Sequence, residues 1–182
     1  MERIIRTVRM NEFDSTEKFV EKVFTDSEGE ENGKNVRKLV AEIRNYKYYL
    51  SELDLVMVNE NDEIMGHVMF SRFHLDGRYE NDLLLLSPVS VKTEFQRQHV
   101  SKELIEYGLA KARALGYKLC MVEGNPMNYR ARGFRTSADF SIFADDSVGL
   151  PHPDCLMIQE LVPGALEGVH GYVNYKMYES LS

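Results

Sequence analysis

The feature that most constrains the fold of this chain is a strand–helix–strand succession between Leu83 and Glu123. The apolar stretch Leu83–Val91 predicts a strand, and Val100–Leu115 predicts a helix because its apolar residues recur on one face. Gly116 provides a C-cap for that helix, and Tyr117–Glu123 is apolar enough for a buried strand. Strands that alternate with long helices predict an α/β architecture.

Pro88 lies inside the first of these strands. Proline has no backbone N–H to donate to a neighbouring strand, so it is rare in a central strand. We therefore expect the strand pairing to be interrupted at this point.

The rest of the chain continues the alternation. Helices are predicted at Thr16–Phe24, Val36–Tyr49 and Met127–Arg132, and strands at Ile4–Arg9, Leu55–Val58, Ile64–Leu75, Phe140–Phe143 and Leu156–Leu161. The acidic, glycine-containing stretch Asp26–Asn35 is predicted to be a loop. No repeat or linker divides the sequence, which predicts a single domain over residues 1–182.

Composition argues against several classes of function. The 182 residues carry a net charge of −7, which opposes a nucleic-acid partner. The longest apolar run, Leu83–Leu86, is too short for a membrane span. The five histidines are scattered without metal-ligand spacing, so no metal site is predicted. Cys120 and Cys155 form no CxxC motif, and the N-terminus has no apolar signal segment; both observations favour a cytoplasmic protein with reduced thiols.

A candidate anion site lies where the long helix begins. A helix N-terminus presents free N–H groups and a positive dipole end, which favour a phosphate. The segment Gln96–Lys102 occupies this position, and Arg97 and Lys102 add positive charge. The alternative is an ordinary helix start with solvated polar side chains.

Four stretches, taken in order, resemble the GCN5-related N-acetyltransferase (GNAT) family. They are Ile64–Ser71, the pair Leu86–Val91 and Phe95–Gln98, the stretch Gly124–Arg135, and Glu160–Leu166 with Gly168 and Gly171. Within the family, the chain is similar to bacterial acetyltransferases with a GDPxYYxRFGF-like stretch followed by a late ELVPGAL stretch. The resemblance covers nearly the whole chain.

This resemblance implies a fold and a cofactor. The expected fold is a mixed, mostly antiparallel sheet flanked by helices, in which the parallel fourth and fifth strands splay apart. Acetyl-CoA is expected in that gap, with its pantetheine arm paired to the backbone of Val89, Ser90 and Val91. Its pyrophosphate is expected on the amides of Gln96, Arg97, Gln98, His99, Val100, Ser101 and Lys102.

The sequence departs from the family at two of these positions. Where the family pattern has glycine, this chain has His99, and where it has glycine or alanine, it has Ser101. Glycine lets a backbone approach a phosphate without interference from a Cβ atom. The His99 imidazole either crowds the phosphate or, when protonated, pairs with it.

Tyr129 is the catalytic candidate that the resemblance implies. It lies five residues before Phe134, at the family spacing, and a phenol can protonate the departing thiolate as a general acid. The alternative is an aromatic residue packed over the short helix. Asn125 is expected to shape the turn and to contact the cofactor. The general base is not evident: Glu123 is a candidate, although a solvated carboxylate at a strand end is the commoner role, and Cys120 is expected to be a buried, inert thiol.

The function implied is acetyl transfer from acetyl-CoA to a primary amine, by direct attack in a ternary complex. The acceptor is expected to be a small molecule or a peptide, and a homodimer is consistent with the family. The aromatic cluster Tyr46, Tyr48 and Tyr49 is interpreted either as a substrate pocket or as helix-end packing. Two alternative functions remain: a non-catalytic acyl-CoA-binding or interaction protein on the same scaffold, and a relative that has lost CoA.

Overall fold

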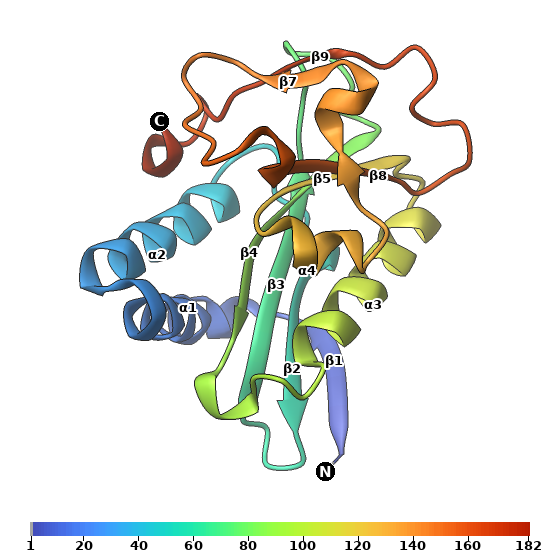
Figure 1. The fold of residues 1–182 in the computed structure, drawn as a ribbon. Helices are drawn as coiled ribbons and strands as arrows, with labels where there is room; N and C mark the ends of the chain where they lie inside the picture. The colour runs from blue at the N-terminus through green and yellow to red at the C-terminus, as the bar shows by residue number, and fades with distance from the viewer. Residues whose placement is uncertain (1) are drawn as a thin grey trace.

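The computed structural model describes residues 2–182, and a β-sheet lies at its centre (Figure 1). Within these residues, seven strands form one sheet in the order β1-β2-β3-β4-β5-β8-β6, and two more form a small parallel sheet, β7-β9. The strands of the large sheet are β1 (Arg3–Thr7), β2 (Asp54–Asn59), β3 (Ile64–Arg72), β4 (Leu83–Val91), β5 (Leu119–Glu123), β6 (Arg135–Thr136) and β8 (Leu156–Glu160). The small sheet pairs β7 (Ile142–Ala144) with β9 (Gly171–Val173).

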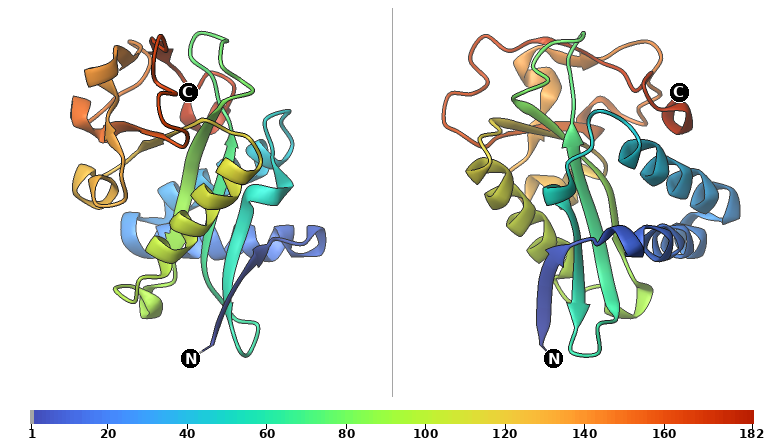
Figure 2. Two further views of the ribbon diagram at one scale, coloured as in Figure 1. Left: turned by 90° about the vertical axis from the view of Figure 1, so that its right-hand side faces the viewer. Right: turned by 180° about the vertical axis from the view of Figure 1, so that it is seen from behind.

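Helices cover both faces of the large sheet, as Figure 2 shows. They are α1 (Phe13–Glu28), α2 (Glu30–Arg44), α3 (Val100–Ala114) and α4 (Pro126–Arg130). Alternation along β4 divides the core, because successive side chains of a strand point to opposite faces. Leu84 and Leu86 belong to the cluster that includes the apolar side of α3, whereas Leu83 and Leu85 pack with the C-terminal segment on the opposite face. Met69 of β3 joins α1 and α2 in a third cluster.

The mixed, mostly antiparallel sheet confirms the expected fold. Among the described residues, β4 and β5 form the only parallel strand pair of the large sheet. The predicted bounds of Leu83–Val91 are also confirmed. The register between β3 and β4 shifts between Val68 and Phe70, opposite the part of β4 that contains Pro88, as expected for a residue that cannot donate to the ladder.

The loop predicted over Asp26–Asn35 is wrong. Helix α1 continues to Glu28, and α2 begins at Glu30 after the single left-handed residue Gly29 (φ 98°). The acidic residues that suggested a loop instead stabilise the helices: Lys22 pairs with Asp26 at 2.8 Å and Lys34 with Glu30 at 2.7 Å, both at i,i+4 spacing.

Gly33 also misled the prediction. It lies inside α2, where a Cβ atom would come within 2.0 Å of the Thr25 hydroxyl oxygen. Glycine is needed here because α1 and α2 approach closely, and the sequence alone does not distinguish this role from that of a loop glycine.

Other predicted bounds were too long or displaced. The helix predicted over Val36–Tyr49 ends at Arg44, and the strand predicted over Ile64–Leu75 ends at Arg72. The strand expected at Phe140–Phe143 begins at Ile142, since Ser137–Phe140 form a 3₁₀ turn. No helix in residues 2–182 is long and apolar enough to cross a membrane.

Candidate active site

The site begins where β4 and β5 separate. The two strands pair only from Leu83 to Leu85 and from Leu119 to Met121, although β4 continues to Val91 and β5 to Glu123. Beyond that point, β4 pairs with β3 on one side, and within residues 2–182 no strand pairs with its other edge. The backbone edge of Val89, Ser90 and Val91 is thus available to a ligand, as the predicted splay requires.

The segment between β4 and α3 is held in an unusual backbone conformation. Arg97 (φ 60°) and His99 (φ 65°) both adopt left-handed backbone angles that glycine takes most readily. His99 is the N-cap of α3, and its carbonyl accepts the first helical hydrogen bond, from the Glu103 amide at 3.0 Å. The family pattern described above has glycine at the position of His99, and glycine readily adopts a left-handed backbone. This chain keeps the left-handed turn although the residue is histidine.

A cavity of about 360 Å³ opens at this turn. Because the first helical bond comes from Glu103, the amides of the three preceding residues have no acceptor within the helix. The cavity is lined by Val91, Phe95, Gln96, Arg97, His99, Val100, Ser101 and Arg132. Five of the predicted cofactor residues between Gln96 and Lys102 thus share one cavity.

The other two predicted residues of this loop lie beside the cavity. Lys102 is exposed on the first turn of α3. The Gln98 side chain donates to the Glu94 carbonyl at 3.1 Å, and the Gln98 carbonyl accepts from the Arg3 guanidinium at 2.8 Å. Gln98 therefore fixes the loop in place.

Arg132 is the lining residue that sequence reasoning missed. Its guanidinium donates to the Ser101 hydroxyl at 3.3 Å and to the Asn128 carbonyl at 2.6 Å, while its buried Nε atom has no partner within residues 2–182. The neighbouring Arg130 instead pairs with Asp154 at 3.2 Å. The sequence does show two nearby arginines, Arg130 and Arg132, in an acidic chain, which suggests an anion site. Their spacing alone does not indicate which of them faces α3.

Tyr129 lies on α4 and packs, like Val89 and Val91 of β4, against the core cluster that contains side chains of α3. Its ring packs edge-on against Phe134 with centroids 5.8 Å apart, and a Cβ atom at Gly124 would come within 2.6 Å of it. Burial raises the pKa of the Tyr129 phenol, so the hydroxyl stays protonated at neutral pH. Asn125 is the N-cap of α4 and accepts from the Met127 amide at 3.0 Å, which fits its expected part in shaping the turn.

Glu123 lies at the end of β5, on the opposite face of the sheet from α3. The Tyr175 hydroxyl donates to its carboxylate at 2.9 Å, and burial raises the pKa of that phenol. A cavity of about 110 Å³ beside them is lined by Leu85, Ser87, Glu123, Tyr175 and Leu181. An exposed carboxylate thus lies next to the part of β4 where the strands diverge.

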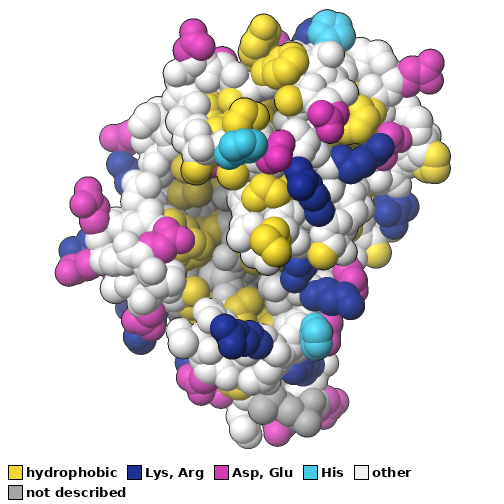
Figure 3. Space-filling model, in the orientation of Figure 1, with side chains coloured by type: hydrophobic (Ala, Val, Ile, Leu, Met, Phe, Trp, Pro, Cys, Tyr) yellow, Lys and Arg dark blue, Asp and Glu magenta, His cyan; other side chains and the backbone are white. Residues whose placement is uncertain are grey.

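The molecular surface also has a wider hollow, beside α1 and α2. In Figure 3 the surface is hollowed between the two N-terminal helices and the part of the chain that contains α4, with hydrophobic side chains inside it. β4 passes behind this hollow in Figure 1. The arrangement leaves room for a second molecule next to the diverging strands.

Beneath α1 and α2 is a buried polar cluster. The Asp54 carboxylate accepts from Arg44 Nε at 3.0 Å and from the Tyr49 hydroxyl at 2.7 Å, and it lies 2.7 Å from His67 Nε2. Burial alone would raise the pKa of Asp54, but the hydrogen bond to His67 and the charge of Arg44 hold it below its ordinary value. In the register of β3 and β4, His67 lies opposite Ser90. The cluster therefore lies next to the part of β4 whose other edge is open.

The three tyrosines after α2 pack against neighbouring side chains. Tyr48 is buried, Tyr46 contacts Tyr178 with centroids 5.6 Å apart, and Tyr49 binds Asp54. These contacts favour helix-end packing over a substrate pocket. Cys120 is fully buried, and burial raises the pKa of its thiol, which makes it a poor nucleophile.

Comparison with known proteins assigns the family. The model of the acetyltransferase (GNAT) domain matches residues 4–137, which is most of the chain. The chain therefore belongs to the GNAT family and is an acetyltransferase by class. No curated protein matches it in sequence.

Solved structures share the fold along almost the whole chain. A GNAT family N-acetyltransferase (YhbS) from Escherichia coli, in complex with CoA, has a TM-score of 0.83 at 22% identity, covering 96% of this chain and 90% of that one. A GNAT family acetyltransferase from Brucella melitensis, in complex with acetyl-CoA, has a TM-score of 0.73 at 24% identity and covers 96% of both chains. An aminoglycoside 6'-acetyltransferase type Ii has a TM-score of 0.64 at 16% identity, covering 88% of this chain and 98% of that one.

Proposed function

We propose that this acetyltransferase takes its acetyl group from acetyl-CoA and transfers it to a primary amine, by direct attack in a ternary complex. The observation that carries the proposal is the separation of β4 from β5 beside a left-handed turn at the start of α3. The structural neighbours with bound CoA or acetyl-CoA support the cofactor. The aminoglycoside acetyltransferase supports an amine acceptor by analogy of fold.

The residues present fit a phosphate-bearing cofactor. Within the described residues, the amides of the first turn of α3 have no acceptor in the helix, and the Arg97 and Arg132 side chains line the cavity; together they supply donors and positive charge. Ser101 also lines the cavity, and its hydroxyl accepts a hydrogen bond from Arg132. The backbone of Val89, Ser90 and Val91 would hold the pantetheine arm, and Asn125 would border it.

When bound, acetyl-CoA supplies the acetyl group as a thioester whose C–S bond breaks as the amine forms the new C–N bond. Tyr129 would donate its phenolic proton to the departing sulfur. Glu123 would accept the proton that the amine nitrogen must lose, with the Tyr175 hydroxyl orienting its carboxylate. The low polarity around Tyr129 keeps the phenol protonated before reaction.

Thermal unfolding with and without acetyl-CoA tests the proposal, with CoA and ATP as controls. A ligand that binds the folded state at a hundredfold excess over its Kd stabilises it by about 2.7 kcal/mol. We expect stabilisation by acetyl-CoA and CoA that ATP does not reproduce. No shift at millimolar acetyl-CoA would contradict the proposal.

A non-catalytic acyl-CoA-binding protein is the second candidate, because His99 and Ser101 replace small residues in the phosphate turn. Release of free thiol from acetyl-CoA on addition of amines distinguishes the two candidates. Stabilisation by acetyl-CoA without thiol release over a broad amine panel would favour the binding protein.

We further propose that residues 1–182 act as one N-acetyltransferase domain in the cytoplasm. The two cysteines of the chain are free, which agrees with a reducing compartment. The acceptor would be a small molecule or a peptide, and a homodimer stays a prediction that size-exclusion chromatography with light scattering can test.

A further inference from the structure

Glu123 has an apolar neighbour on the next strand. In the antiparallel register of β5 and β8, Glu123 lies directly opposite Leu156, so their side chains leave the same face of the sheet. Leu156 is buried in the cluster that also contains Tyr175, the residue that binds the Glu123 carboxylate. The proposed proton acceptor therefore lies between the divergence of β4 and β5 and an apolar region.

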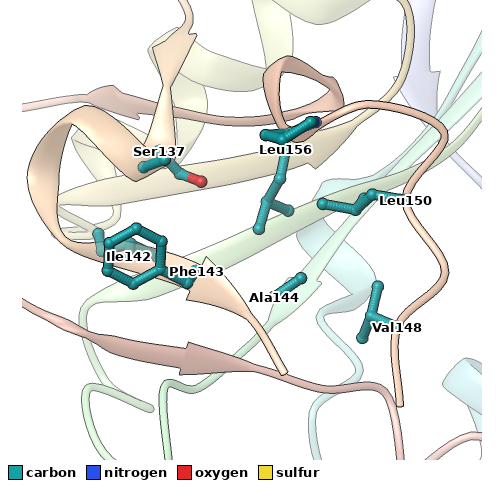
Figure 4. Close-up of a pocket in the computed structure, with 9 residues that line it drawn as sticks. Ser137, Ile142, Phe143, Ala144, Val148, Leu150 and Leu156 are labelled. Carbon is teal, nitrogen blue, oxygen red and sulfur yellow. The ribbon is translucent and has the colours of Figure 1, made fainter. Parts of the chain in front are cut away.

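That region contains a cavity of about 270 Å³ that the acetyl-transfer chemistry does not use. Leu156, Leu150 and Val148 point toward a common space between β7, β8 and the loop that joins them (Figure 4). Apart from Ser137, every residue lining the cavity has an aliphatic, aromatic or proline side chain. A cavity of 150 Å³ with such a lining can hold a benzene ring, so this one has room for a substituted ring or a branched alkyl group.

Among the side chains that line the cavity, that of Ser137 is polar. Ser137 is 1% exposed, and its hydroxyl has no hydrogen-bond partner within residues 2–182. Figure 4 shows that hydroxyl facing the space that Leu156 and Ile142 border. A buried hydroxyl without a partner costs free energy, and a ligand that supplies a partner would recover it.

We propose, on the basis of the function proposed above, that the acceptor is a primary amine with an apolar aromatic or branched substituent. The amine lies at Glu123, whose negative charge favours an ammonium group. The substituent enters the apolar cavity beside Leu156. A polar atom on the substituent, such as the phenol oxygen of tyramine, meets the Ser137 hydroxyl.

Steady-state acetylation of matched amines tests this substrate class. The probes are ethylamine, 2-phenylethylamine and tyramine, with thiol release as the signal. Burial of a side chain of phenyl size predicts a kcat/KM for 2-phenylethylamine that is roughly 10- to 100-fold higher than for ethylamine. Equal values for the two amines, or a preference for polar amines such as aminoglycosides, would overturn the inference.

Two variants test whether the substituent of the amine binds in the cavity. Ala144→Leu should fill part of it and raise KM for 2-phenylethylamine at least tenfold, with KM for ethylamine unchanged. Ala114→Leu, on an exposed position of α3, is the matched control and should change neither value. Ser137→Ala removes the hydroxyl with little loss of volume and should reduce any preference for tyramine over 2-phenylethylamine. Unchanged selectivity in both cavity variants would overturn the inference.

Binding of the cofactor separates this inference from the function on which it rests. Acetyl-CoA should stabilise Ala144→Leu by the same Tm shift as the wild-type protein, which also shows that the variant folds. A wild-type protein that acetyl-CoA stabilises but that acetylates ethylamine as well as 2-phenylethylamine contradicts the substrate class alone. A protein that acetyl-CoA does not stabilise contradicts both.

Discussion

The Arg132 guanidinium lies 3.3 Å from the Ser101 hydroxyl and so joins the turn after α4 to the first turn of α3. These two segments border the cavity at the left-handed turn, and 31 positions of the sequence separate the two residues. Arg130 and Arg132 both lie in α4 or the turn that follows it, but in the described chain only Arg132 lines this cavity. Its contact with Ser101 therefore holds the guanidinium at the proposed phosphate site.

Replacement of Arg132 by alanine should weaken acetyl-CoA binding about 10- to 100-fold, because hydrogen bonds to a charged group contribute roughly 1.5–3 kcal/mol. Isothermal titration calorimetry measures the change. Arg130→Ala is the matched control, since Arg130 pairs with Asp154 and does not line the cavity. Equal losses in the two variants would show that Arg132 does not contact the cofactor.

Tyr129→Phe should lower kcat roughly 100-fold, the usual scale for loss of a general acid, while the Kd of acetyl-CoA stays unchanged. Since burial raises the pKa of the phenol, the wild-type enzyme should lose no activity through deprotonation of Tyr129 between pH 7 and its ordinary pKa of about 10. A pH–rate profile tests this. Tyr107→Phe, on the exposed side of α3, is the control, and an unchanged kcat in Tyr129→Phe would remove Tyr129 as the acid.

Glu123→Gln should also lower kcat, by roughly 100-fold at neutral pH, because the amide cannot accept the proton of the amine. The deficit should shrink as the pH approaches the pKa of the acceptor amine, since deprotonated amine then forms in solution. The readout is kcat/KM against pH, with Glu106→Gln on α3 as the control. A deficit that is constant with pH would indicate a role in positioning instead.

His99→Gly should raise the free energy of unfolding by about 1 kcal/mol, because a left-handed backbone costs a non-glycine residue roughly 1–2 kcal/mol and glycine recovers part of it. Chemical denaturation measures the change. Ser101→Gly, inside the helix, should instead destabilise the protein by about 0.5–1 kcal/mol. Tighter acetyl-CoA binding in His99→Gly would mean that the imidazole crowds the phosphate. Weaker binding would mean that the imidazole pairs with the phosphate.

Asp54→Asn should destabilise the protein by roughly 1.5–3 kcal/mol, because the buried Arg44 guanidinium loses its 3.0 Å ion pair with Asp54 and keeps, among the described residues, only the longer one, with Glu17 at 3.6 Å. The pKa of Asp54 is lowered in the folded state, so its contribution is fully present above the ordinary carboxyl pKa near 3.8 and is lost as the pH falls through the lower folded value. Urea denaturation at pH 7 measures the loss. Asp14→Asn, an exposed partner of Lys18, should leave stability unchanged within error.

Local patterns were sufficient to predict much of this protein. The helix of residues 100–114 and the strand of residues 83–91 follow from the spacing of apolar residues, and the interruption of pairing near Pro88 follows from its missing N–H group. These features depend on neighbours in the sequence, where periodicity and backbone chemistry act directly. The ordered motifs from Ile64 to Leu166 also sufficed to indicate the family.

Contacts between distant segments decided the rest. Gly33 is a helix residue because α1 and α2 approach closely there, and no local pattern encodes that approach. Arg132 faces Ser101, whereas Arg130 faces Asp154, since the turn after α4 sets the direction of each side chain. Leu156 lies beside Glu123 only through the register of β5 and β8. Proton transfer, phosphate binding and acceptor choice all depend on such pairings, which packing creates and sequence spacing leaves open.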